Sequence, residues 1–453
     1  MLSKKNRGVV DKVNNQHKEI HMKRAVIVGM GFGGLKAARA LSGKGVEVLV
    51  IDRRNFHLFQ PLLYQVATAA IEQEYIAYPS RAVLRKCKGI NFRLGEVTGV
   101  DFDKRIVRLA DGEVPYDYLI LAAGSATHYF GMKSMEEHSF DLKSLDQTVR
   151  LRNHILNSFE LASCEPDPAK RRALLSFVVV GGGPAGVEFA GSLQELIQHD
   201  LIKDYPDLNE SDTKIVLIEA RGSILPFLPE KQRDYAVRKL SRMRVEVSLN
   251  TQVSGAEPKK VLLANGSHIP AHTIVWTAGV QAAAIAAALE LPKGAGGRIA
   301  VEPDLTIAGR PEVFVVGDIA FLPQNGVPLP MVAQVAMQGG EYAGKAILSR
   351  IKGQPVAPFK YFDKGNMAII GRNAAAVNAF GVFRFNGYFA WVAWLALHLY
   401  YLTGFRNRTM VGISWMLNYF FRSQQVRVIS ASTAKEEKVL LKQPEVATST
   451  KVV

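Results

Sequence analysis

The chain has 453 residues, 48% of them hydrophobic, and carries a formal net charge of +15. This length allows two or three domains with large cores, and the composition excludes a wholly disordered chain. The only two cysteines, Cys87 and Cys164, lie far apart and no CxxC pair occurs, so a disulfide framework, an iron–sulfur site and a dithiol redox pair are unsupported.

The N-terminal stretch before Arg24 is polar and basic. It lacks the apolar segment of a secretory signal. We therefore expect a disordered extension over residues 1–23, a fold that begins at Arg24, and a bacterial protein that stays on the cytoplasmic side of its membrane.

A first nucleotide-binding unit follows. Residues 24–29 form a short β-branched run typical of a buried strand, a helix is expected to about Leu41, and a second strand over 46–51 ends at Asp52. Between strand and helix, a GxGxxG pattern supplies a tight turn, close backbone approach to a pyrophosphate, and close helix packing. Its glycines are Gly29, Gly31 and Gly34.

The same pattern recurs after a strand over residues 176–180, with Gly181, Gly183 and Gly186. The returning strand, 214–218, ends at Glu219, whose carboxylate should attract the ribose of NADH and repel the 2′-phosphate of NADPH. A lone GxGxxG is weak evidence, but two copies in this strand–turn–helix context predict two dinucleotide sites.

Two further strand-like runs indicate the connectivity. Residues 118–121 precede the second unit and lead into Ala123, whereas residues 313–316 follow it and lead into Gly317 and Asp318. We therefore predict an α/β fold with two Rossmann-like dinucleotide-binding domains, the second inserted in the first.

The C-terminal part is apolar, aromatic and basic. Residues 385–405 and 409–421 carry no Asp, Glu, Lys or Arg, and no Asp or Glu occurs from Lys364 through Lys435. Basic residues around apolar aromatics suit an anionic lipid surface better than nucleic acid. We expect residues 380–430 to form interfacial helices. A membrane-spanning segment over 385–405 and a buried hairpin remain the alternatives.

With these motifs placed, the chain resembles the two-dinucleotide flavoprotein oxidoreductases and, more closely, the type II NADH dehydrogenases (NADH:quinone oxidoreductases). The resemblance covers about residues 24–430. Four stretches carry it: Pro61–Ala67 beside the flavin, Trp276–Val280 with Gly279 on the NADH side, the AQxAxQ motif at Ala333–Gln338, and Gly404–Arg408.

The resemblance implies a noncovalent FAD in the first unit, NADH in the second, and a quinone as acceptor, without proton pumping or a metal. It also implies a peripheral, usually homodimeric enzyme, here on the cytoplasmic face of the bacterial inner membrane. The expected divisions are 24–150 and 275–359 for FAD, 151–274 for NADH, 360–431 for the membrane-associated domain, and a disordered tail over 432–453.

The same resemblance suggests site residues. Glu188, expected in the first turn of the second unit's helix, becomes a charge partner near the nicotinamide and flavin rings. Gln334 and Gln338 share a helical face and could hydrogen-bond the quinone or the flavin. Lys364 could stabilise the reduced flavin, and Gln60 flanks the flavin loop. Each also has a plain structural reading, as a helix-dipole partner or an exposed side chain.

Two other functions compete. One is a reductase of the same architecture with a different acceptor, such as a disulfide or ferredoxin. The missing CxxC and the apolar tail argue against it. The other is a membrane-bound NADH sensor, which the intact glycine motifs and Asp318 disfavour.

Overall fold

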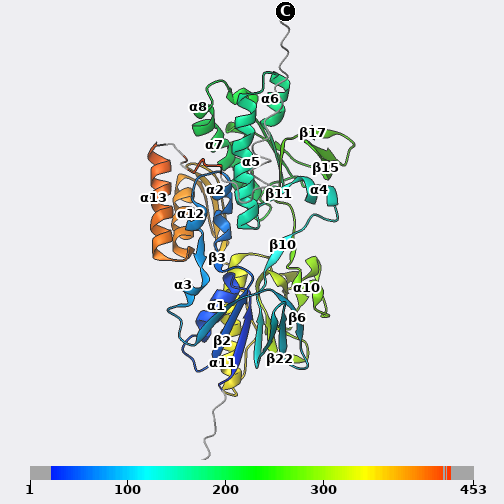
Figure 1. Cartoon of the computed structure of the whole chain (residues 1–453), viewed down its shortest axis with the longest axis vertical. Coiled ribbons are helices and arrows are strands. Elements are labelled where there is room, and N and C mark those ends of the chain that lie inside the picture. Colours follow the sequence, from blue (N-terminus) through cyan, green and yellow to red (C-terminus); the bar gives the residue numbers. More distant parts are fainter. Residues whose placement is uncertain (1–21, 422–423, 425, 430–453) are drawn as a thin grey trace, which may run out of the picture.

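The structure is a computed structural model that describes residues 22–421, 424 and 426–429. Apart from Met22 and Lys23, the predicted N-terminal extension and the predicted tail lie outside the described residues. The described chain forms two α/β domains stacked along the long axis of the molecule, with a smaller C-terminal unit at their side (Figure 1).

The first domain is built on a six-stranded sheet in the order β21-β22-β9-β1-β2-β5. Only the β21–β22 pair is antiparallel. Residues Ala25–Val28 of β1 are at most 5% exposed, as a central parallel strand that is covered on both faces requires. The strands are β1 (Arg24–Val28), β2 (Glu47–Asp52), β5 (Ile90–Leu94), β9 (Tyr118–Leu121), β21 (Thr306–Ile307) and β22 (Arg310–Val315).

Two helices pack closely over this sheet, α1 (Phe32–Leu41) and α11 (Ala333–Ile351). A Cβ on Gly340 would lie 2.0 Å from the carbonyl oxygen of Gly33, so the two backbones approach as only glycine allows. Gly317 likewise packs against α11, since a Cβ there would lie 3.1 Å from that of Ala336. The AQxAxQ motif is thereby fixed beside the first glycine turn.

The second domain carries a five-stranded sheet in the order β11-β18-β12-β13-β14, all parallel. Helices α5 (Leu145–Ser163), α7 (Pro184–Leu196) and α9 (Glu230–Arg242) pack around it. The strands are β11 (Phe140–Asp141), β12 (Ser176–Val180), β13 (Lys214–Ile218), β14 (Val245–Ser248) and β18 (Thr273–Trp276).

The chain crosses between the domains at a two-stranded antiparallel ribbon of β10 (Ser125–Thr127) and β19 (Val280–Ala282). The first crossing therefore precedes β11, upstream of the division expected at residue 150, which falls inside α5. The second crossing follows β18, a few residues after the expected 275. Residues 128–150 and 275–279 thus belong with the second sheet, because β11 and β18 are strands of it.

Smaller elements complete the two domains. They include two three-stranded antiparallel sheets, β6 (Val97–Asp101) with β7 (Ile106–Leu109) and β8 (Gly112–Pro115), and β15 (Val253–Glu257) with β16 (Lys260–Leu263) and β17 (His268–Pro270). The other short elements are the pairs β3–β4 (Phe56–Leu58, Ala77–Pro79), β20–β23 (Ile299–Ala300, Ala320–Phe321) and β24–β25 (Pro323–Gln324, Val327–Pro328), with helices α2 (Leu63–Ala67), α3 (Ser80–Leu84), α4 (Lys133–His138), α6 (Pro168–Leu174), α8 (Ile202–Asp204) and α10 (Ile285–Ala288).

The C-terminal unit is a three-stranded antiparallel sheet followed by two helices. It consists of β26 (Gly365–Gly371), β27 (Ala374–Ala379), β28 (Phe383–Gly387), α12 (Tyr388–Tyr401) and α13 (Phe405–Phe421). This unit packs on the second domain, since a Cβ on Gly191 of α7 would lie 1.9 Å from the carbonyl oxygen of Ile370. Within the described residues, none of the helices is both long and apolar enough to cross a membrane.

Candidate active site

The two glycine turns open onto one cavity of about 480 Å³ between the domains. Gly29 and Gly31 line it from the first domain, and Gly183 lines it from the second. Neither turn is filled by side chains, because a Cβ on Gly31 or Gly183 would meet nothing within 4 Å. The space beside each helix N-terminus is therefore free for a diphosphate group.

The first turn is fixed by sterics and by Asp52. Gly29 has φ of +100°, and a Cβ on Gly34 would lie 1.9 Å from the Gly29 carbonyl oxygen, so helix and turn meet at van der Waals contact. The Asp52 carboxylate accepts hydrogen bonds from the backbone N–H groups of Met30 (2.7 Å) and Arg54 (2.8 Å). It thus holds the turn and also borders the cavity.

The residues present fit a bound FAD at this turn. Arg54 lines the cavity next to Asp52, and its Nε atom is buried without a hydrogen-bond partner. A buried cationic N–H without an acceptor is costly unless an anionic or polar ligand completes it. The pyrophosphate and ribose of a dinucleotide have this chemistry.

The second turn repeats the design. Gly181 has φ of +115°, and a Cβ on Gly186 would lie 2.0 Å from the Gly181 carbonyl oxygen. The Glu219 carboxylate accepts hydrogen bonds from the backbone N–H groups of Gly182 (2.8 Å) and Arg221 (2.9 Å). Glu219 therefore relates to this turn as Asp52 does to the first, although it is not among the residues that line the cavity.

Asp318 lies where the first sheet faces the cavity. Ser125 donates a hydrogen bond to Asp318 Oδ2 (2.6 Å), and the Lys143 ammonium donates one to the Ser125 hydroxyl (3.1 Å). These three side chains come from the loop after β22, from β10 and from the loop after β11. They connect the two domains inside the cavity.

Glu188 is the fifth residue of α7, so it lies just past the first turn in which the sequence placed it. Its side chain lines the cavity and is buried, and Oε1 accepts a hydrogen bond from the Ile369 N–H at 3.3 Å. Burial raises the pKa of Glu188 to about 8, with the Ile369 hydrogen bond opposing this effect. The carboxyl group is therefore mainly protonated at neutral pH.

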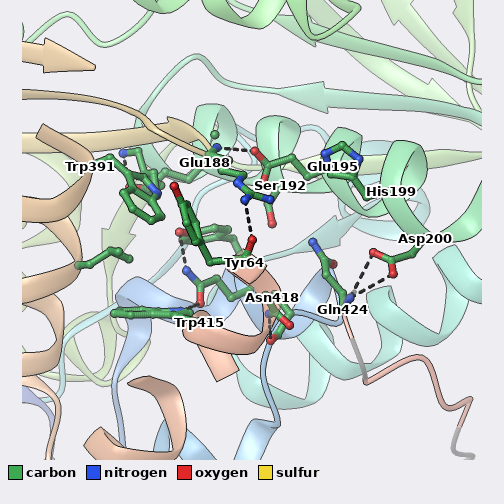
Figure 2. Close-up of a pocket in the computed structure, with 17 residues that line it drawn as sticks. Tyr64, Glu188, Ser192, Glu195, His199, Asp200, Trp391, Trp415, Asn418 and Gln424 are labelled. Atoms are coloured by element: carbon green, nitrogen blue, oxygen red, sulfur yellow. Dashed lines mark hydrogen bonds between the residues drawn. The ribbon is translucent and has the colours of Figure 1, made fainter. Parts of the chain in front are cut away.

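A second cavity of about 110 Å³ adjoins the first, between α7 and the C-terminal helices. Tyr64 and Glu188 line both cavities. Figure 2 shows Glu188, Ser192, Glu195 and His199 along one side of the second cavity, facing aromatic side chains. The aromatic residues that line this cavity are Tyr64, Trp391, Trp415 and Tyr419.

The C-terminal helices are tied to the loop beside the first cavity. Trp415 Nε1 donates to Gln65 Oε1 (2.7 Å), and Asn418 Nδ2 donates to the Ala70 carbonyl (2.9 Å). His398 of α12 lines the first cavity and stacks on Trp394, with ring centroids 3.7 Å apart. Burial lowers the pKa of His398 to about 4, so its ring is neutral at physiological pH.

The two glutamines of the AQxAxQ motif hold a neighbouring loop. Gln334 Nε2 donates to the Gly365 carbonyl and Gln338 Nε2 to the Phe362 carbonyl, each at 2.9 Å. Gln334 Oε1 is buried without a hydrogen-bond partner. Neither glutamine lines the first cavity, and neither does the exposed Lys364.

The sequence therefore located much of the cavity wall. Ten of the proposed site residues line it: Gly29, Gly31, Asp52, Gln60, Ala123, Gly183, Glu188, Gly279, Gly317 and Asp318. Gly34, Gly181 and Gly186 do not line the cavity, but their close backbone contacts determine the shape of the two turns. Sequence reasoning missed Arg54, Lys143 and His398 as lining residues, since none belongs to a motif with fixed spacing, and it did not single out Thr277 within the stretch Trp276–Val280. For Arg54, its position two residues after Asp52 was the only available signal.

A shared cavity with two pyrophosphate cradles defines an oxidoreductase that brings two dinucleotides together. The family model described as "Pyridine nucleotide-disulphide oxidoreductase" matches residues 23–340. The Type II NADH:quinone oxidoreductase NdhA of Mycobacterium tuberculosis is 40% identical over 90% of this chain and 89% of its own length. A second relative from that organism, Type II NADH:quinone oxidoreductase Ndh, is 40% identical over 87% of this chain and 88% of its own.

The chain belongs to the pyridine nucleotide-disulphide oxidoreductases and, among them, to the type II NADH:quinone oxidoreductases. The structure of NDH2 from Plasmodium falciparum in complex with NADH has the same fold, with a TM-score of 0.83 at 18% identity over 90% of this chain and 100% of that one. Disulfide chemistry has no support here, because Cys87 and Cys164 are free and neither lines either of the two cavities described above.

Proposed function

We propose that this enzyme passes electrons from NADH to a membrane quinone through FAD, and that the two substrates approach the flavin from different sides. The observation that carries this proposal is the shared cavity, which both glycine turns and the C-terminal helix α12 line. NADH would lie on the second turn, FAD on the first, and quinone toward the C-terminal helices.

We assign the residues of the cavity to FAD, to NADH and to the proton according to their positions. When bound, FAD accepts a hydride and releases electrons. Gly29, Gly31 and Asp52 would hold its diphosphate and ribose, and Asp318 would hold its ribityl chain. Gly183 and Glu219 hold NADH. The overall reaction, NADH + H⁺ + quinone → NAD⁺ + quinol, takes up one proton, and Glu188 holds a proton at the boundary of the two cavities.

The second cavity is the proposed approach for quinone. Its aromatic walls suit a planar apolar ring, and Tyr64 and Glu188 place it next to the flavin cavity. Trp391 forms part of that wall on α12. Trp391→Ala should raise KM for quinone several-fold, whereas flavin reduction by NADH, followed by stopped-flow absorbance, should be unchanged. Trp391→Phe serves as the conservative control. An unchanged KM for quinone in Trp391→Ala would contradict this approach route.

We also propose that the C-terminal unit docks on anionic lipid. Most of the large hydrophobic side chains that the described residues leave exposed lie within residues 380–421, and three of them, Phe389, Phe405 and Phe420, are 77%, 86% and 72% exposed. Such a concentration of exposed apolar side chains in one unit is typical of an interaction surface. Exposed arginines border it, namely Arg384, Arg406 and Arg408, with no acidic residue nearby in sequence.

Vesicle flotation tests the docking surface. Burying one Phe side chain is worth about 1.5–3 kcal/mol, so the triple variant F389S/F405S/F420S should lose at least a hundredfold in binding to vesicles of phosphatidylglycerol and phosphatidylethanolamine. Val327→Ser, equally exposed on the β24–β25 hairpin (67%), is the matched control. Retained binding by a triple variant that keeps its flavin would refute the assignment.

The remaining proposals concern location and assembly. The basic, apolar C-terminal surface supports peripheral attachment to the cytoplasmic face of the inner membrane, where anionic lipid is available. A homodimer stays a prediction from family resemblance. Sedimentation velocity of the flavin-loaded protein in detergent distinguishes one copy from two.

A further inference from the structure

The first cavity is poor in positive charge. Among its lining residues only Arg54 and Lys143 carry a permanent cation, against the carboxyl groups of Asp52, Glu188 and Asp318. Arg54 follows β2, next to Asp52, whereas Lys143 lies across the cavity beside Asp318. In the sheet order β22-β9-β1-β2, these two positions are at opposite ends of the first cradle.

Lys143 is held firmly on the side of the second domain. Its backbone N–H donates to Asp141 Oδ1 (3.0 Å), and its carbonyl oxygen accepts a hydrogen bond from Gln60 Nε2 (3.4 Å). Thr127 donates to the other oxygen of Asp141 (3.1 Å). The ammonium group then reaches Ser125, which itself donates to Asp318. The lysine therefore has a fixed direction into the cavity.

Its neighbours place Lys143 near the reacting end of the dinucleotides. β11, which precedes it, pairs with β18, and β18 leads into Thr277 and Gly279 on the nicotinamide side. Burial lowers the pKa of Lys143, while Asp318 and Asp141 oppose that effect. A cation in this position is poorly hydrated and interacts strongly with any charge that develops in the cavity.

We propose that Lys143 is the cation that stabilises the negative charge a flavin gains on reduction, with Ser125 as the positioning residue for its ammonium group. The inference rests on the proposed function, since it requires FAD in the first cradle. It gives Lys143 the role that sequence resemblance suggested for Lys364, whose side chain is exposed and outside the cavity.

The flavin midpoint potential tests this directly. An opposite charge within about 4–6 Å changes the equilibrium constant between the uncharged and charged forms of a group by at least about tenfold. For a two-electron couple, a tenfold change in the equilibrium constant corresponds to about 30 mV. Lys143→Met should therefore lower the midpoint potential by about 30 mV or more in a dye-coupled reductive titration. Lys143→Arg keeps the positive charge, so its midpoint potential should be close to that of the wild type. Lys260→Met, which removes an exposed lysine on β16 paired with Glu257, should leave it unchanged.

A second neutral variant, with a polar side chain, keeps the test decisive if Lys143→Met does not retain flavin. Lys143→Gln can still reach Ser125 but has no charge, so it should show the same fall in potential even if Lys143→Met purifies without flavin. Wild-type potential in Lys143→Gln, or a fall in Lys143→Arg as large as in the neutral variants, would overturn the proposal. A colourless wild-type protein that FAD does not restore would instead overturn the proposed function.

Discussion

Replacing Glu188 by glutamine should change how the stability of this protein depends on pH. The Glu188 carboxyl group is buried between two cavities, and burial raises its pKa from 4.5 to about 8. In the unfolded chain the group regains its ordinary pKa. Between these two values the folded protein binds a proton that the unfolded chain releases, so Glu188 makes stability fall as pH rises.

The magnitude follows from that interval. Each pH unit within that interval changes the free energy of unfolding by about 1.4 kcal/mol for one proton. The Glu188 carboxyl group should therefore lower the free energy of unfolding by on the order of 5 kcal/mol at pH 8 relative to pH 4.5. Stability contributed by this group is fully present below pH 4.5 and is lost as pH approaches 8. Glutamine keeps the shape and one carbonyl acceptor for the Ile369 N–H but cannot ionise.

Thermal unfolding of the purified enzyme at pH 5 and pH 8, followed by flavin fluorescence, measures the effect. Glu188→Gln and wild type should unfold at similar temperatures at pH 5, and the variant should be several degrees more stable at pH 8. Glu113→Gln, which neutralises an exposed carboxylate on β8, controls for net charge. A temperature difference between Glu188→Gln and wild type that is the same at both pH values would refute the reasoning.

Three other substitutions test the cradles and the specificity. Gly34→Ala places a Cβ 1.9 Å from a carbonyl oxygen, so the protein should purify with a large fraction of its FAD missing, as judged by visible absorbance. Gly186→Ala creates the matching clash of 2.0 Å in the second turn and should weaken NADH binding at least tenfold while the flavin spectrum persists. Glu219→Gln removes a charge that repels a 2′-phosphate, so the ratio of kcat/KM for NADPH to that for NADH should rise about tenfold. An unchanged ratio would exclude Glu219 from cofactor selection.

Local patterns predicted the nucleotide units well, because their residues are set by local geometry. Gly29 and Gly181 adopt positive φ, and Gly34 and Gly186 touch the turn before them, all within a few residues of sequence. The acidic residue at the end of the next strand is set by the same turn. Such requirements leave fixed spacings in the chain, and fixed spacings can be recognised.

Other parts of the site depend on pairings between distant segments. Lys143 reaches Ser125, the hydrogen-bond partner of Asp318, because β11 joins the edge of the second sheet, and two-residue strands leave little pattern in the sequence. The polar face of Gln334 and Gln338 was recognised, but its partners were not, since the carbonyl groups of residues 362 and 365 offer no side-chain signal. Sequence therefore identified the motif and left its contacts open.

Helix α7 links the cavity between the two domains with the C-terminal unit. Its N-terminus forms the second cradle, Glu188 one turn later borders both cavities, and Gly191 then lets β26 pack directly on the helix backbone. Because β26 begins the C-terminal unit, this contact fixes the unit against α7, in addition to its hydrogen bonds with Gln65, Ala70 and Gln334 of the first domain. Helices α12 and α13, for which we propose lipid contact, are thereby held close to Glu188. A larger side chain at Gly191 should therefore displace the C-terminal unit and reduce quinone turnover, while FAD bound in the first domain stays in place.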